Sequence, residues 1–193
     1  MSMEKTSGFT LIETMVAVTI LTLSVAGPLY TADRAIVAAQ TASAQLTASY
    51  LAQEGVEYVR MLRDDDYLNT YYTPGATDVS ITAWTAFLTE IAPCAATACM
   101  LDPLKSAGVG PTDALIQLTT GTPQTLYDAT PLYLLSNGEY TQQSGSGTKQ
   151  VFTRIVQAAA VSATEEAVTS TVTWPFHDTT YKVTVTDHLT QWQ

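Results

Sequence analysis

Positively charged side chains are scarce in this chain of 193 residues, which holds 8 Lys and Arg against 18 Asp and Glu. The formal net charge is −10, and the few cations do not cluster along the sequence. Nucleic-acid binding needs a basic surface that neutralises phosphates, so we expect no nucleic-acid partner. Charged residues of both signs make up 13% of the chain, about half the share usual in soluble globular proteins. Serine and threonine supply much of the polarity instead, which favours a β-rich extracellular surface over a cytosolic enzyme.

Signatures of catalysis are also missing from the sequence. It contains no nucleophile elbow, no phosphate-binding glycine loop and no HExxH zinc motif. The only two histidines, His177 and His188, neighbour Asp178 and Asp187. A metal or catalytic site there would need a third group and a pocket, so we interpret both histidines as surface residues at strand ends. We therefore expect a protein that is not an enzyme and holds no cofactor.

The chain has only two cysteines, Cys94 and Cys99, in the stretch CAATAC. Without a nearby histidine, this pair cannot complete a metal site by itself. A local disulfide that closes a surface loop is the favoured interpretation if the chain is exported. Two reduced thiols in a cytosolic loop are the alternative, so the choice depends on localisation and hence on the N-terminus.

Residues 9–30 read FTLIETMVAVTILTLSVAGPLY, an apolar run whose one charged residue is Glu13. As a helix this run would be about 33 Å long, enough to cross a hydrocarbon core of about 30 Å. Lys5 is the only cation before it, which gives a slight bias for a cytoplasmic N-terminus. Gly27 and Pro28 predict a kink within this transmembrane helix, because proline removes one backbone hydrogen bond.

Two other interpretations of the apolar run compete with a transmembrane helix. A secretory signal peptide is supported by Ser24, Val25 and Ala26, which are small where such peptides are cut. Against it, Glu13 would fall inside the apolar region, and a leader with one cation is weak. A buried core helix of a cytosolic protein is the minor option.

The segment GFTLIETMVAV at residues 8–18 resembles the cleavage and methylation motif of type IV pilin-like proteins. These include major and minor pilins and the pseudopilins of type II secretion and DNA-uptake machines. The motif needs a small residue before the cut, an aromatic residue after it and a glutamate at the fifth mature position, here Gly8, Phe9 and Glu13. The resemblance implies that a prepilin peptidase cuts between Gly8 and Phe9 and N-methylates Phe9. It also implies that Glu13 recruits a subunit through a terminal amine, which fits the cost of an unpaired carboxylate in hydrocarbon.

Residues 31–63 predict an amphipathic continuation of the helix. Two apolar stripes follow three- and four-residue steps: Ile36, Ala39, Ala42, Leu46 and Tyr50, then Leu51, Gly55, Tyr58 and Leu62. We expect the helix to end near Arg63, because Asp64, Asp65 and Asp66 would oppose the negative end of the helix dipole. These three aspartates are weak candidates for a calcium site. A solvated cluster is preferred, because adjacent side chains seldom point the same way.

The remaining sequence predicts a variable loop region at residues 64–112 and an antiparallel sheet at residues 113–193. The first region contains a short amphipathic helix at 81–92, followed by the cysteine loop. In the second, four to five strands alternate β-branched and polar residues, with turns at 162–165 and 175–178. The Asn137-Gly138 dipeptide predicts a hairpin with a type I′ turn. The expected fold class is α+β, with one long N-terminal helix packed on a small antiparallel sheet.

Together these features predict a structural subunit, most like a minor pilin of a type IV pilus. Residues 1–8 are the expected leader, and the chain would span the cytoplasmic (inner) membrane before it joins an extracellular filament. The resemblance implies three kinds of partner: other pilin subunits through the helix, the prepilin peptidase and an inner-membrane assembly platform. One alternative is a pseudopilin of a secretion or DNA-uptake system. The other is a secreted or membrane-anchored binding domain with a conventional signal peptide.

Overall fold

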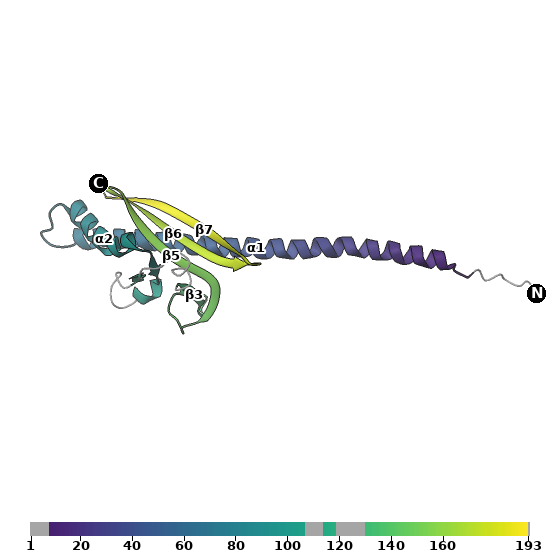
Figure 1. Cartoon of the computed structure of the whole chain (residues 1–193). Helices are drawn as coiled ribbons and strands as arrows, with labels where there is room; N and C mark the ends of the chain where they lie inside the picture. Colours follow the sequence, from purple (N-terminus) through teal and green to yellow (C-terminus); the bar gives the residue numbers. More distant parts are fainter. Residues whose placement is uncertain (1–7, 107–113, 119–129, 193) are drawn as a thin grey trace, which may run out of the picture. The chain divides into compact units, whose positions relative to one another are not determined.

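The computed structural model describes residues 8–106, 114–118 and 130–192 (Figure 1). The chain divides into two compact units, Met1–Ala44 and Gln45–Gln193; the second is called the head below. The elements in chain order are α1 (Leu11–Tyr71), α2 (Val79–Ala96), β1 (Cys99–Leu101), the 3-10 helix η1 (Pro103–Ser106), β2 (Leu115–Gln117), β3 (Pro131–Leu134), β4 (Tyr140–Thr141), β5 (Thr148–Ser162), β6 (Glu165–Phe176) and β7 (Thr179–Thr190). The predicted α+β class, a long N-terminal helix packed on an antiparallel sheet, is confirmed.

Helix α1 is 61 residues long, and its buried residues all lie within the head. They are Ala48, Leu51, Ala52, Gly55, Val56, Tyr58, Val59 and Leu62. Their three- and four-residue spacing puts them on one face of the helix, which packs against the sheet. The second predicted stripe is therefore buried. The residues of the first stripe, from Ile36 to Tyr50, are exposed.

The expectation that α1 ends near Arg63 is wrong, because the helix continues to Tyr71. The three aspartates do not act together as a block of charge at the helix end. Asp64 accepts a hydrogen bond from Arg63 Nη2 at 2.8 Å, and Asp66 is drawn into a contact with α2 described below. The hydroxyl of Thr70 also donates to the Asp66 carbonyl at 2.8 Å, which supports the last turns. Residues 64–71 are therefore helical rather than loop.

Helix α2 is longer than the predicted segment 81–92 and belongs to the core of the head. Trp84, Phe87, Ile91 and Cys94 are buried in the main apolar cluster with residues of α1 and the sheet. By length and composition α2 could cross a membrane, as could the N-terminal part of α1. Its packing and its place in the core assign it to the head instead. The apolar N-terminal part of α1, in contrast, buries none of its residues within the chain.

Seven strands form one antiparallel sheet in the part of the chain that the structure describes. The long strands β5, β6 and β7 follow one another as a meander, with β6 in its centre. The other edge of β5 is shared by two short pairs of strands. There β3 lies opposite Thr148 to Thr153 and carries β4, whereas β1 lies opposite Val156 and carries β2.

The two predicted hairpins differ in their turns. At the β6–β7 connection His177 and Asp178 have φ angles of 46° and 57°, so both central residues are left-handed, as a type I′ turn requires. At the β3–β4 hairpin only Gly138 is left-handed, with a φ angle of 89°. Its N–H donates to the Leu135 carbonyl at 3.1 Å. The hairpin is confirmed, but the type I′ turn predicted at Asn137-Gly138 is wrong.

The approach of α1 to the sheet depends on one glycine. A Cβ atom added to Gly55 would lie 3.0 Å from Ser170 Cβ and closer still to Ser170 Oγ. Real Cβ atoms rarely tolerate contacts this short, so a larger residue would push α1 away from β6. Gly55 therefore sets the spacing between the helix and the sheet at the centre of the head.

Candidate assembly segment and head surfaces

The start of α1 positions Glu13. The helix begins at Leu11, so Thr10 is its N-cap, and Thr10 Oγ1 accepts a hydrogen bond from the Glu13 N–H at 3.3 Å. Glu13 is then the third helical residue, the place of the acidic partner in a capping box. The positive end of the helix dipole also stabilises a carboxylate in this first turn. The pattern T-x-x-E in the sequence could have revealed this local role, which our sequence analysis missed.

The predicted cleavage site precedes this cap. Gly8 and Phe9 lie outside regular secondary structure, and the Phe9 side chain is 80% exposed. A Cβ atom added to Gly8 would meet no atom within 4 Å, so nothing described crowds the Gly8–Phe9 bond. An extended, accessible peptide bond is what a peptidase needs to bind. Cleavage at this bond and methylation of Phe9 remain predictions.

The apolar part of α1 satisfies its own hydroxyl groups. Thr14, Thr19, Thr22, Ser24 and Thr31 each donate to the carbonyl three residues earlier, at 2.8–2.9 Å. Hydroxyls bonded in this way cost little in hydrocarbon, because no polar group is left without a partner. Pro28 lies inside the helix, directly after Gly27. The kink expected at these two residues also remains a prediction.

In the head, a fully buried arginine joins three elements. Arg154 projects from β5, and its Nη1 donates to the Leu51 carbonyl at 3.1 Å and to Glu54 Oε2 at 2.5 Å on α1. Its Nη2 donates to the Leu101 carbonyl of β1 at 2.8 Å. A buried cation is tolerated only where such partners replace water. The sequence signal was a cation at an inward position of an alternating strand, VFTRIVQ, but its partners lie about a hundred residues away in the chain.

A buried glutamine extends this polar network. Gln142 Oε1 accepts a hydrogen bond from the Leu101 N–H at 2.7 Å, and its Nε2 donates to the Thr130 and Arg154 carbonyls at 3.0 and 2.9 Å. It therefore fills the place between β1 and β3, where β5 changes partner strands. A buried backbone group that loses such a hydrogen bond and finds no other partner costs about 1–3 kcal/mol. The network's contacts indicate a structural role.

Two carboxyl groups meet between α1 and α2. Burial raises the pKa of Glu90 to about 7, and the neighbouring carboxylates of Asp66 and Asp65 add to this rise. Burial also raises the pKa of Asp66, whose side chain is hydrogen-bonded to Glu90. Asp66 Oδ2 and Glu90 Oε1 are buried, and neither has a hydrogen-bond partner as long as both carboxyl groups are ionised. One proton shared between the two groups accounts for the contact.

The structure does not gather Asp64, Asp65 and Asp66 into a calcium site. Asp64 is paired with Arg63, whereas Asp66 contacts Glu90. Within residues 8–106, 114–118 and 130–192, no group of three or more His, Cys, Asp or Glu side chains is placed to hold a metal ion. Cys94 and Cys99 form a disulfide. This disulfide closes a short loop between the last turn of α2 and β1, and both cysteines are buried rather than at the surface.

The positions and contacts of the two histidines and of two tryptophans indicate that these side chains support the fold. His177 lies in the β6–β7 turn, and His188 Nδ1 lies 2.7 Å from Glu165 Oε1 on the neighbouring strand. Trp84 is buried and donates through its Nε1 to the Ala163 carbonyl at 2.9 Å, and Trp174 is also buried. Trp192, the third tryptophan, is exposed and lies at a pocket.

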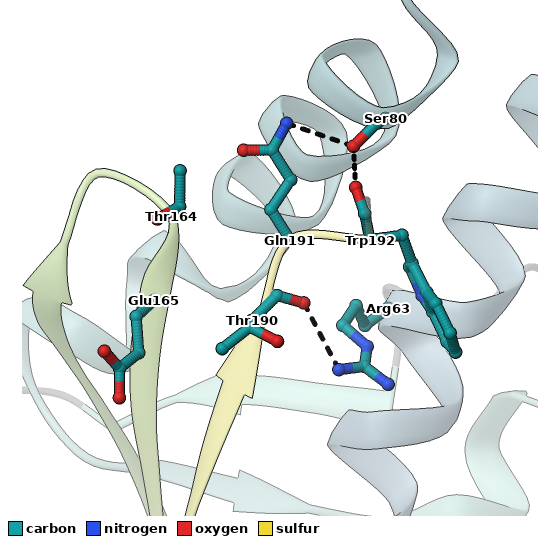
Figure 2. Close-up of a pocket in the computed structure, with 7 residues that line it drawn as sticks. All are labelled: Arg63, Ser80, Thr164, Glu165, Thr190, Gln191 and Trp192. Atoms are coloured by element: carbon teal, nitrogen blue, oxygen red, sulfur yellow. Dashed lines mark hydrogen bonds between the residues drawn. The ribbon is translucent and has the colours of Figure 1, made fainter.

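This pocket has a volume of about 560 Å³ and is formed by four segments of the head (Figure 2). Its lining residues are Arg63 of α1, Ser80 of α2, Thr164 and Glu165 at the β5–β6 turn, and Thr190, Gln191 and Trp192 at the end of β7. Arg63 Nη1 donates to the Thr190 carbonyl at 3.3 Å, and the guanidinium lies 4.8 Å from the centre of the Trp192 ring. Ser80 donates to the Trp192 carbonyl.

Comparisons with known proteins bear on the N-terminus only. A family model described as the prokaryotic N-terminal methylation motif matches residues 3–27. Neither the search of curated proteins nor the search of solved structures found a significant match. The matched segment contains Gly8, Phe9 and Glu13, together with most of the apolar run. The chain therefore carries a prokaryotic N-terminal methylation motif at the start of its long helix, and this segment supports a likeness to type IV pilin-like proteins.

Proposed function

We propose that this protein is a structural subunit of a type IV pilus, of the minor pilin kind. The methylation motif at residues 3–27 carries this proposal. It is supported by α1, which has an exposed apolar N-terminal part and a C-terminal part packed in a folded head. Before assembly the apolar part anchors the subunit in the inner membrane. After assembly it packs against the helices of other subunits, so contacts with lipid are replaced by contacts with protein.

Processing creates one half of the proposed assembly contact. The prepilin peptidase cuts between Gly8 and Phe9, which leaves a terminal amine two residues before the start of α1. Glu13 of one subunit then pairs with the Phe9 amine of a neighbour at the assembly platform. An ionised carboxylate in hydrocarbon is costly unless it is paired, so this contact favours a subunit that is docked over one that is alone in the membrane.

Mass spectrometry of the mature N-terminus tests the proposal directly. We expect the chain from assembled filaments to begin at methylated Phe9. A chain that begins near Gly27 would instead support a conventional signal peptide and overturn the proposal.

The role of Glu13 is tested by Glu13→Ala, with Asp33→Ala as the matched control. Both remove an exposed carboxylate from α1, but only Glu13 is placed near the new amine. We expect Glu13→Ala subunits to be cut and inserted into the membrane but to be missing from sheared filaments, whereas Asp33→Ala subunits are incorporated. Normal incorporation of Glu13→Ala would contradict the pairing argument.

A further inference from the structure

We propose that the pocket lined by Arg63, Ser80, Thr190, Gln191 and Trp192, with the aromatic rings beside it, binds a neutral carbohydrate (Figure 2). This inference rests on the proposed function, because it names a ligand class for the exposed head. The volume of about 560 Å³ lies in the range of small-molecule sites, about 300–1,000 Å³. Its polar groups come from separate segments of the head, as expected for a site that folding assembles.

Exposed aromatic rings are the first observation. Trp192 is 45% exposed, Tyr71 60% and Tyr72 75%. They form a continuous group through Tyr67, whose ring centre lies 5.7 Å from that of Trp192 and 6.3 Å from that of Tyr71. Gathered exposed rings mark contact surfaces, because leaving them in water is costly. The C–H face of a sugar ring packs well on such rings, while its hydroxyl groups need polar partners nearby.

Fixed hydrogen-bonding groups are the second observation. Gln191 Nε2 donates to Ser80 Oγ at 3.1 Å, which holds the amide and turns its oxygen the other way, toward Thr164 (Figure 2). Arg63 is held by Asp64 and by the Thr190 carbonyl. Groups held in this way lose little freedom on binding, so they favour a ligand with directional hydroxyls. The Thr190 side chain adds a hydroxyl to the same lining.

Charge decides between a neutral and an acidic sugar. Arg63 is the only cation in the lining, and it already forms an ion pair with Asp64. Glu165 adds a negative charge to the lining, and the whole chain carries −10. An acidic ligand would approach against this field and find no free cation among the lining residues. A neutral polyhydroxylated ligand meets neither obstacle.

The pocket lies toward the C-terminal end of α1 within the head. Arg63 follows Gln45, the first residue of the head, by 18 helical positions, or about 27 Å of helix. The site therefore lies far along α1 from the point where the helix enters the head.

The test uses full-length protein in detergent micelles. Calorimetric titrations with glucose, galactose, mannose and N-acetylglucosamine, and with sialyllactose as the acidic probe, would measure binding. We expect at least one neutral sugar to bind and sialyllactose to bind more weakly. Trp192→Ala should lower the affinity for the neutral sugar roughly tenfold, because one stacking contact is lost. Trp192→Phe should restore most of this affinity. Tyr50→Ala, which removes an exposed ring at the other end of the head, should leave binding unchanged.

Each contrary outcome overturns the inference. These are no binding by any of the four neutral sugars, tighter binding of sialyllactose, equal affinity for Trp192→Ala, or an equal loss with Tyr50→Ala. The proposed function is tested separately by filament incorporation. Glu13→Ala should bind the sugar normally but fail to assemble, whereas Trp192→Ala should assemble normally, so the two proposals fail in distinguishable ways.

Discussion

The contact between Asp66 and Glu90 makes the stability of the head depend on pH, and Glu90→Gln removes this dependence. The pKa of Glu90 is raised from 4.5 to about 7 in the folded head. The folded state therefore binds more protons than the unfolded state between these values. It follows that the free energy of unfolding falls as the pH rises from about 4.5 to about 7, and stays low above that range.

The size of the effect follows from the same shift. A change from 4.5 to about 7 corresponds to at most about 3–4 kcal/mol, since each factor of ten in proton affinity is worth about 1.4 kcal/mol. Water reaches part of this contact and screens it, so we expect about 1–2 kcal/mol between pH 5 and pH 8. Glutamine keeps a hydrogen-bond donor toward Asp66 and carries no charge. Glu90→Gln should therefore match the unaltered protein at pH 5 and exceed it by this amount at pH 8.

Urea unfolding of the full chain in detergent, followed by tryptophan fluorescence, measures this difference. Trp84 lies on the same helix as Glu90 and is buried, so it reports on the contact. Glu57→Gln, on the exposed side of α1, is the control and should change the free energy by less than about 0.5 kcal/mol at either pH. Glu166, whose pKa burial also raises, contributes equally to all three proteins. Equal losses between pH 5 and pH 8 for the unaltered protein and Glu90→Gln would refute the reasoning.

Three further substitutions test the packing of the head by urea unfolding. Gly55→Ala should cost about 1–3 kcal/mol because its methyl group meets Ser170, and adding Ser170→Gly should recover part of the loss; additive losses would contradict a direct contact. Arg154→Ala should cost about 3–5 kcal/mol, because it leaves buried partners unpaired. Arg154→Met fills the volume but leaves the same partners unpaired, so it should cost nearly as much; full recovery of stability by Arg154→Met would argue against the polar network. Replacing Cys94 and Cys99 by serine should cost about 2 kcal/mol, as expected for a short closed loop. A reductant should then lower the free energy of unfolding of the unaltered protein but not that of this variant.

Local sequence patterns were enough to predict the long helix and the long strands. The apolar run, the second stripe of α1 and the alternation in β5, β6 and β7 are each written in consecutive residues, so periodicity revealed them. The short strand β1 has three residues, too few to show a period, and it lies where a loop was predicted. It exists because β2 and β5 offer it partners, which only the folded chain brings together.

Contacts between distant residues explain what the sequence could not reveal. The end of α1 was misplaced because three consecutive aspartates predict repulsion, whereas Glu90 on α2 changes the surroundings of Asp66. The partners of Arg154 lie on α1 and β1. Its inward position in an alternating strand therefore indicated a buried cation, but it did not indicate which residues bind it. The pocket at Trp192 combines the last strand with both helices, and no motif marks it.

The surroundings of Glu13 change the energetic argument for its role in assembly. A carboxylate deep in an apolar helix would be costly before it met any partner. Glu13 instead lies in the first turn, where the Thr10 cap and the positive end of the helix dipole support a negative charge. In a subunit that has not yet assembled, the Glu13 carboxylate therefore costs less free energy than its place in an apolar run implies. In the proposed assembly contact, the amine of a neighbouring subunit then supplies specificity as well as a balancing charge, and cleavage after Gly8 would create such an amine at Phe9, two residues before this helix.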